Sequence, residues 1–171
     1  MPRYVAFLRG VSPMNCSMAA LRGCLEDLGF ENVKTVRSSG NAVFDARKSA
    51  TGALERRIEA KLAAGVGRSF GTFVRSRDEL ASMLEADAFA AHKLPAAAKR
   101  LVTFLHEPPE QPPGLPIVID GAWIVACAGR EVFAAYEPGH TGPEFMKLLE
   151  DSFGKNITTR TWDTVRKCVA A

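Results

Sequence analysis

The fold of the first half of the chain is decided by residues 33–45, Val33-Lys34-Thr35-Val36-Arg37-Ser38-Ser39-Gly40-Asn41-Ala42-Val43-Phe44-Asp45. Apolar residues on either side of the Ser-Ser-Gly run predict two strands, at 33–36 and 42–45, that pair around a tight turn. Gly40 supplies a positive φ at little cost, and Asn41 tolerates one better than most residues. This hairpin is the centre from which the rest of the first half is organised.

The flanking segments give the order strand, helix, strand, strand, helix, strand over residues 4–75. Residues 4–8 form the first strand, Ser17 is a suitable N-cap for the first helix, and Gly29 ends that helix. A second helix is expected at 51–64 and a fourth strand at 70–75. The simplest fold with this order is a ferredoxin-like βαββαβ sandwich, in which the first and third strands are central neighbours. Arg9 and Asn41 are therefore expected near the same edge of the sheet.

The second half also predicts an α+β structure, smaller and with antiparallel strands. Ser76 and Glu79 form a capping box that opens a helix to about residue 86. Five prolines at 107–116 predict an extended loop. The remaining expected elements are strands at 100–106, 123–128, 131–136 and 157–160 and helices at 144–152, with Pro143 as its first residue, and at 162–169. We expect an α+β protein with two subdomains, 1–76 and 77–171.

Composition limits the possible classes of protein. The 171 residues are 47% hydrophobic and 24% charged, with a formal net charge of +3, which is typical of a globular protein and does not require a nucleic acid partner. No apolar stretch approaches the roughly 20 residues of a membrane span. The start of the chain runs into a strand pattern without a leader, and unpaired cysteine spacing suits a reducing compartment. We expect a cytoplasmic protein that does not bind a membrane.

Metal, cofactor and nucleotide motifs are missing from the sequence. The four cysteines show no Cys-x-x-Cys spacing, and the three histidines lie far apart. A zinc site needs clustered ligands, so none is expected. The phosphate-binding glycine patterns are also absent, because Gly65 and Gly67 follow a helix and have no third glycine. We therefore expect no cofactor, and no catalytic motif identifies an enzyme.

Three stretches together resemble one bacterial family, the domain of unknown function 1697. They are 4–11, 28–44 and 157–165, the last reading Ile-Thr-Thr-Arg-Thr-Trp-Asp-Thr-Val. The resemblance implies two α+β halves, the first ferredoxin-like, and it implies no reaction. Two departures matter. Residues 11–15, Val-Ser-Pro-Met-Asn, replace a glycine-containing loop, and Thr161 stands where the family usually has asparagine. Neither a glycine cradle for phosphate nor a role for that asparagine carries over.

The strongest candidate site is a ligand-binding cluster at the ends of the strands. Guanidinium groups, hydroxyls and the backbone amides of a turn together suit a phosphate or a carboxylate. Turn chemistry and core packing alone also account for these residues. The candidate residues are Arg9, Arg37, Ser38, Ser39, Asn41, Arg160 and Trp162. The leading hypothesis is a binding module for a nucleotide, a phosphorylated metabolite or a nucleic acid.

Other hypotheses remain open at this stage. A small hydrolase or transferase would use His140 as a base with a loop serine, such as Ser12, or with Cys16, which lies before a helix that can lower a thiol pKa. A protein-interaction module would expose an apolar patch instead of a pocket. Ferredoxin-like sheets can also stack RNA bases on aromatic residues, for which Phe7 and Phe44 are the candidates. The sequence does not select a ligand or an oligomeric state.

Overall fold

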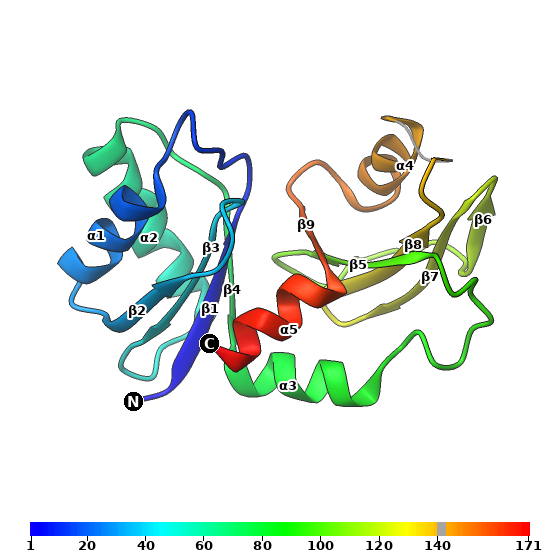
Figure 1. Cartoon of the computed structure of the whole chain (residues 1–171), viewed down its shortest axis with the longest axis horizontal. Helices are drawn as coiled ribbons and strands as arrows, with labels where there is room; N and C mark the ends of the chain where they lie inside the picture. Colours follow the sequence, from blue (N-terminus) through cyan, green and yellow to red (C-terminus); the bar gives the residue numbers. More distant parts are fainter. Residues whose placement is uncertain (140–142) are drawn as a thin grey trace. The chain divides into compact units, whose positions relative to one another are not determined.

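The computed structural model describes residues 1–139 and 143–171, and they form two compact units. The first unit comprises Met1–Leu84 and Thr164–Ala171, and the second comprises Glu85–Asp163. Both units are mixtures of helices and antiparallel sheet (Figure 1). The α+β class is thus confirmed. The first compact unit ends later than the expected subdomain 1–76 and takes in the C-terminal residues, and the division into domains at 76 stays a prediction.

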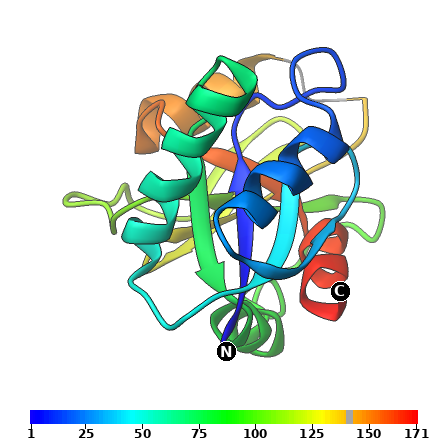
Figure 2. The same cartoon turned by 90° about the vertical axis from the view of Figure 1, so that its left-hand side faces the viewer.

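The first unit has the predicted βαββαβ order. Its elements are β1 (Arg3–Leu8), α1 (Met18–Asp27), β2 (Glu31–Thr35), β3 (Asn41–Asp45), α2 (Thr51–Val66) and β4 (Thr72–Ser76). The sheet order is β2-β3-β1-β4, and the pairs β1–β3 and β1–β4 are antiparallel. This is the ferredoxin-like arrangement, with β1 and β3 adjacent in the middle of the sheet. Figure 2 shows α1 and α2 side by side over one face of these strands.

Local signals in the sequence set the ends of the helices. The Ser17 hydroxyl accepts a hydrogen bond from the Ala20 amide at 3.1 Å, so it caps α1 as predicted. At the other end Gly29 has φ +85°, and the Phe30 amide donates back to the Leu25 carbonyl, which is a Schellman ending. The Glu79 amide donates to the Ser76 hydroxyl at 3.1 Å, which confirms the predicted cap at the start of α3 (Arg77–Ala86).

The core of the first unit lies between the sheet and its two helices. Side chains that alternate along β1, such as Ala6 and Leu8, meet Leu21 and Leu25 of α1 in one buried cluster. The other members come from the remaining strands and from α2, and they include Phe44, Leu54, Ile58, Leu62 and Val74. This single apolar layer fixes the face of each strand and therefore the register of the sheet.

The register separates Phe7 from Phe44. Tyr4 is opposite Phe44 across β1 and β3, so Phe44 lies on the helix-covered face, whereas Phe7, three residues after Tyr4, lies on the other face. Both phenylalanine side chains are completely buried. These two residues therefore do not form the exposed aromatic platform that base stacking requires.

The second unit is built on a five-stranded antiparallel sheet of order β6-β7-β8-β5-β9. Its elements are β5 (Lys99–Phe104), β6 (Ile117–Ile119), β7 (Ala122–Ala128), β8 (Glu131–Tyr136), α4 (Pro143–Phe153) and β9 (Thr158–Thr161). The short strand β6 was not predicted. Phe145 and Leu149 of α4 contribute to a buried cluster with residues of β5, β7 and β8. The last helix, α5 (Trp162–Ala170), begins in this unit and ends in the first.

Candidate functional site

The end of β1 joins two other segments of the first unit through its backbone. The Leu8 amide donates to the Gly40 carbonyl at 2.9 Å, and the Arg9 amide donates to the Gly71 carbonyl at 2.7 Å. The loop after β1, the turn before β3 and the loop before β4 therefore lie together at one end of the sheet. This confirms the expected proximity of Arg9 and the turn at 36–41.

The turn before β3 is held from within by Asn41. This side chain is fully buried, and its amide nitrogen donates to the Val36 carbonyl at 2.9 Å and to the Ser39 hydroxyl at 3.0 Å. The Val36 amide also donates to the Asn41 carbonyl. Asn41 thus fixes the turn, in which residues 37–39 are exposed.

Two residues of the turn adopt the left-handed conformation. Gly40 has φ +86°, as predicted, but the second is Arg37, with φ +58°, rather than Asn41, which belongs to β3. A Cβ atom on Gly40 would lie 2.8 Å from the Cβ of Val11, so the glycine also permits close approach of the loop after β1. For an arginine, the left-handed conformation costs about 1–2 kcal/mol. Strain of this kind concentrates at functional sites.

The loop after β1 is closed by a residue that sequence reasoning did not single out. The Asn15 side chain donates to the Gly10 carbonyl at 2.8 Å and accepts from the Ser12 amide at 2.9 Å. The Cys16 amide completes the loop by donating to the Ser12 carbonyl. Asn15 therefore orders this loop through the hydrogen bonds of its side-chain amide.

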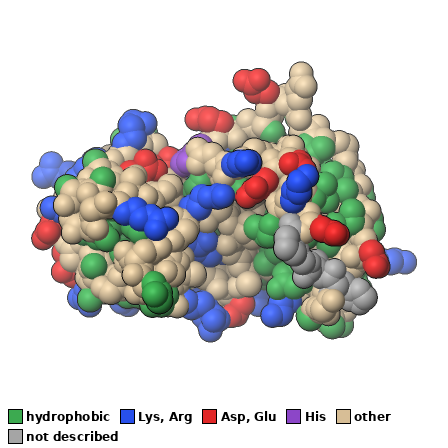
Figure 3. All heavy atoms as spheres, turned by 90° about the horizontal axis from the view of Figure 1, so that it is seen from above, with side chains coloured by type: hydrophobic (Ala, Val, Ile, Leu, Met, Phe, Trp, Pro, Cys, Tyr) green, Lys and Arg blue, Asp and Glu red, His purple; other side chains and the backbone are tan. Residues whose placement is uncertain are grey.

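The polar side chains at this end of the sheet are exposed and basic. Arg9, Arg37, Ser38 and Ser39 are all exposed, and so is Arg68 in the loop that leads to β4. Figure 3 looks onto this end of the molecule and shows several Lys and Arg side chains on its surface. The three segments 8–17, 35–41 and 66–72 contain no aspartate or glutamate. Arg68 was not singled out from the sequence. The antiparallel pairing of β1 with β4, extended by the bond from Arg9 to Gly71, brings its loop to this place.

The remaining two predicted site residues belong to the second unit. Arg160 is buried, and its guanidinium donates to the Thr158 hydroxyl at 2.8 Å and to the Thr159 carbonyl at 2.9 Å. Trp162 is buried as well and meets the rings of Phe89 and Phe133 edge-on. Within the second unit, Arg160 thus bonds to residues of its own strand, and Trp162 packs against two other aromatic rings.

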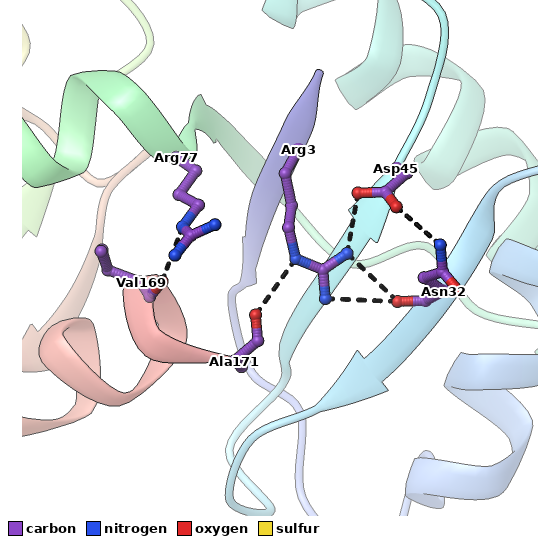
Figure 4. Close-up of polar contacts among 6 residues, drawn as sticks. All are labelled: Arg3, Asn32, Asp45, Arg77, Val169 and Ala171. Carbon is purple, nitrogen blue, oxygen red and sulfur yellow. Dashed lines mark hydrogen bonds and ion pairs between the residues drawn. The ribbon is translucent and has the colours of Figure 1, made fainter. Parts of the chain in front are cut away.

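The opposite end of the first unit's sheet contains a network around Arg3. Its guanidinium donates to Asp45 Oδ1 at 2.8 Å and to the Asn32 carbonyl, and Asn32 Nδ2 donates to Asp45 Oδ2 at 2.8 Å (Figure 4). The hydrogen bonds from Asn32 and Arg3 lower the pKa of Asp45. Arg3 also donates to the Ala171 carbonyl, and Arg77 donates to that of Val169. These bonds attach the last turn of α5 to the first unit.

Cys16, the alternative to a loop serine as the nucleophile of a hydrolase or transferase, has little support in its surroundings. Cys16 is buried, and desolvation, followed by the nearby Cys24, raises the pKa of its thiol, which favours the protonated form. His140 lies outside the described residues. In the described part of the chain no group of three or more His, Cys, Asp or Glu side chains is arranged to hold a metal ion.

The exposed apolar side chains and the helices bear on two further classes of protein, an interaction module and a membrane protein. The large apolar side chains that are exposed in residues 1–139 and 143–171 lie on four separate segments: Met1, Met14, Val118 and Met146. This scattered distribution is common on monomers and gives no argument for an interaction module. Of the helices that the structure describes, none has both the length and the apolar character needed to cross a membrane.

The fold and the site together define a class: a two-unit α+β protein with a ferredoxin-like first unit and basic strand-end loops. Residues 1–120 match the family described as "Protein of unknown function (DUF1697)", and the chain belongs to this family. The conserved bacterial protein SP0830 from Streptococcus pneumoniae has a similar structure, with a TM-score of 0.67, 21% identity and coverage of 99% of this chain and 97% of that one. This likeness shows the shared fold. No curated protein matches the sequence.

Proposed function

We propose that the protein binds a small anionic ligand, a nucleotide or another phosphorylated metabolite, at the strand-end loops of its first unit. The observation that carries this proposal is the meeting of three loop segments with three exposed arginines and no acidic residue. Each guanidinium offers forked N–H donors that match a phosphate or a carboxylate. Ser38 and Ser39 add hydroxyl donors beside Arg37.

The conformation of Arg37 supports a role in binding over a role in folding. Glycine would adopt φ +58° without the strain that arginine carries there. Retaining a strained, exposed arginine is expected where its side chain serves a ligand. Small anions are favoured over nucleic acid, because Phe7 and Phe44 are buried and offer no stacking surface.

A thermal-shift screen against nucleoside mono- and triphosphates, sugar phosphates and a ten-nucleotide RNA tests the proposal, followed by titration calorimetry of each hit. Selective binding raises the melting temperature by mass action. Charge-assisted hydrogen bonds contribute about 1.5–3 kcal/mol, so Arg9→Ala, Arg37→Gly and Arg68→Ala should each weaken binding about tenfold or more. Arg37→Gly is the most informative of these variants, because it should preserve or raise the stability of the fold while weakening binding.

The matched control is Arg22→Ala, which removes the same charge from an exposed ion pair with Glu26 on α1. It should leave binding unchanged. Equal loss in Arg22→Ala and Arg9→Ala would mean that only net charge matters and would contradict a site at the loops. Binding of the RNA without any binding of the small phosphates would contradict a small-molecule ligand.

We also propose a cytoplasmic location. All four cysteines, Cys16, Cys24, Cys127 and Cys168, are free thiols, which suits a reducing compartment. Fractionation of cells that express the protein, with thiol labelling of the recovered chain, tests this. Recovery in an oxidising compartment with disulfide-linked cysteines would contradict it.

A further inference from the structure

At the other end of the first unit's sheet, the side chains around the start of β2 line a half-open hollow. Its volume is about 380 Å³, and its lining includes Leu28, Phe30, Glu31, Ala46, Arg47 and Arg57. A space of this size is at the lower end of the range for small-molecule sites. The lining combines an apolar base with two guanidinium groups and one carboxylate.

Arg57 is held in place by two contacts. Its Cζ atom lies 5.0 Å from the centroid of the Phe30 ring, and Nη2 donates to the Leu28 carbonyl at 3.2 Å. The Phe30 ring is itself stacked on Phe44, with centroids 4.5 Å apart and planes 9° from parallel. The guanidinium therefore rests on a rigid aromatic base. A guanidinium has five N–H donors, so one bond to a carbonyl leaves several for a ligand.

Arg47 is the second cation of the hollow. It lies two residues beyond the end of β3 and is exposed. Among the residues that the structure describes its guanidinium makes no hydrogen bond or ion pair. Glu31 lines the same hollow without pairing with either arginine at ion-pair distance in that part of the chain. The hollow thus presents two positive groups, one fixed and one available, against one negative group.

We propose that this hollow is a second binding site, for a small molecule that carries a phosphate or carboxylate group and a hydrogen-bond donor. The oxyanion lies between Arg47 and the outward N–H groups of Arg57, where two planar forks meet it. The donor faces Glu31, and the apolar part of the ligand contacts Leu28 and Ala46. This site is separate from the strand-end loops, which lie at the opposite end of the strands of the same sheet.

Titration calorimetry of the full chain with inorganic phosphate, ribose 5-phosphate and succinate tests the proposal. At least one of these probes should bind saturably, and the phosphate and carboxylate probes distinguish the two kinds of oxyanion. Arg47→Ala should weaken binding about tenfold or more with little loss of stability, since the exposed guanidinium has no hydrogen bond or ion pair with a described residue to lose. Arg57→Lys keeps the charge but loses the fork and should weaken it about fivefold.

The variant Glu31→Gln distinguishes a hollow that binds an anion from one that has only a structural role. Removing the one negative charge of the lining should tighten the binding of inorganic phosphate by a few fold, because phosphate is an anion at neutral pH and a nearby carboxylate repels it. Glu31 is exposed at the start of β2, so this change should leave the fold unaffected.

The controls separate this site from the strand-end loops. Arg22→Ala should not alter binding at the hollow, and neither should the double variant Arg9→Ala/Arg37→Gly. The proposal is overturned if none of the three probes binds, or if Arg22→Ala weakens binding as much as Arg47→Ala does. It is also overturned if the double variant removes the same binding event, since the strand-end loops would then hold the probe.

Discussion

The two units of the chain differ sharply in charge. The first unit contains 15 Lys and Arg against 8 Asp and Glu, whereas the second contains 7 against 11. The modest net charge of +3 for the whole chain therefore conceals a basic unit and an acidic one. Local charge, and not the total, determines where an anion is attracted. The difference in charge favours the ferredoxin-like unit as the place of the proposed anion site.

The acidic residues of the first unit are mostly engaged in holding its structure. Glu55 and Glu59 of α2 accept hydrogen bonds from the Val74 and Thr72 amides on the edge strand β4. Asp45 pairs with Arg3, and Glu79 caps α3. Glu26 and Asp27 form ion pairs on the helices. These contacts occupy six of the eight acidic side chains of the unit, and exposed basic side chains lie on its loops and on the start of α2.

The largest expected effect is on the stability of the second unit. We attribute this stability to the aromatic cluster of Phe89, Phe133 and Trp162 and not to charged residues. Phe89 is buried and meets Trp162 edge-on, with ring centroids 5.1 Å apart. Phe89→Ala should lower the free energy of unfolding by about 3–5 kcal/mol. Urea unfolding followed by tryptophan fluorescence measures this, because both tryptophans, Trp123 and Trp162, lie in this unit. A loss below about 1 kcal/mol would show that the cluster is dispensable.

The next effect tests how tightly the strand-end loops of the first unit are built. Gly40→Ala introduces a Cβ at φ +86° and 2.8 Å from the Cβ of Val11, and it should cost about 3 kcal/mol. Gly10→Ala is the matched control, since φ is +79° but no atom lies within 4 Å of the added Cβ. It should cost about 1 kcal/mol. Equal costs in urea unfolding would mean that the close approach to Val11 is unimportant.

Much of this arrangement could be predicted because it depends on short-range chemistry. The caps at Ser17 and Ser76 and the turn at Gly40 follow from residues adjacent in sequence, and the order of elements restricted the sheet to one familiar topology. The family resemblance pointed to the same fold.

Features that depend on register or on distant contacts were not predictable. The opposite faces of Phe7 and Phe44 follow only from the pairing of Tyr4 with Phe44. Arg68 lies in a loop that meets the other strand-end loops through the pairing of β4 with β1. Strand β6 is too short, with three residues after a proline-rich loop, to show a period. The hollow lined by Arg47 and Arg57 could not be predicted, because it depends on the contact of Arg57 with Phe30 in the folded chain.

A smaller effect tests whether the acids of the first unit are structural. Glu55 is buried, and its carboxylate accepts from the Val74 amide at 2.8 Å, so Glu55→Ala should cost about 2 kcal/mol by leaving that amide unsatisfied. Glu55→Gln keeps an acceptor oxygen and should cost less. Amide hydrogen exchange at Val74, combined with urea unfolding, measures both effects. Unchanged protection of the Val74 amide in Glu55→Ala would contradict a role for this carboxylate at the edge strand.

The smallest expected effect concerns Asp45 and depends on pH. Hydrogen bonds from Asn32 and Arg3 lower the pKa of Asp45 in the folded protein below the unfolded value of about 3.9. Its contribution to stability is therefore fully present above pH 4 or so and is lost as the pH falls through the folded pKa. Asp45→Asn should be less stable than the native chain at neutral pH, and the difference should shrink progressively below about pH 4. Urea midpoints measured from pH 7 down to pH 2.5 test this.

The control is Asp151→Asn, which removes the same charge from an exposed ion pair with Lys147 on the second unit. It should change stability at neutral pH by less than about 0.5 kcal/mol. The stability difference between Asp45→Asn and the native chain could instead stay constant down to pH 2.5. That result would mean that the Arg3 network does not depend on the ionised carboxylate, and it would contradict a structural role for the charge of Asp45 in the basic unit.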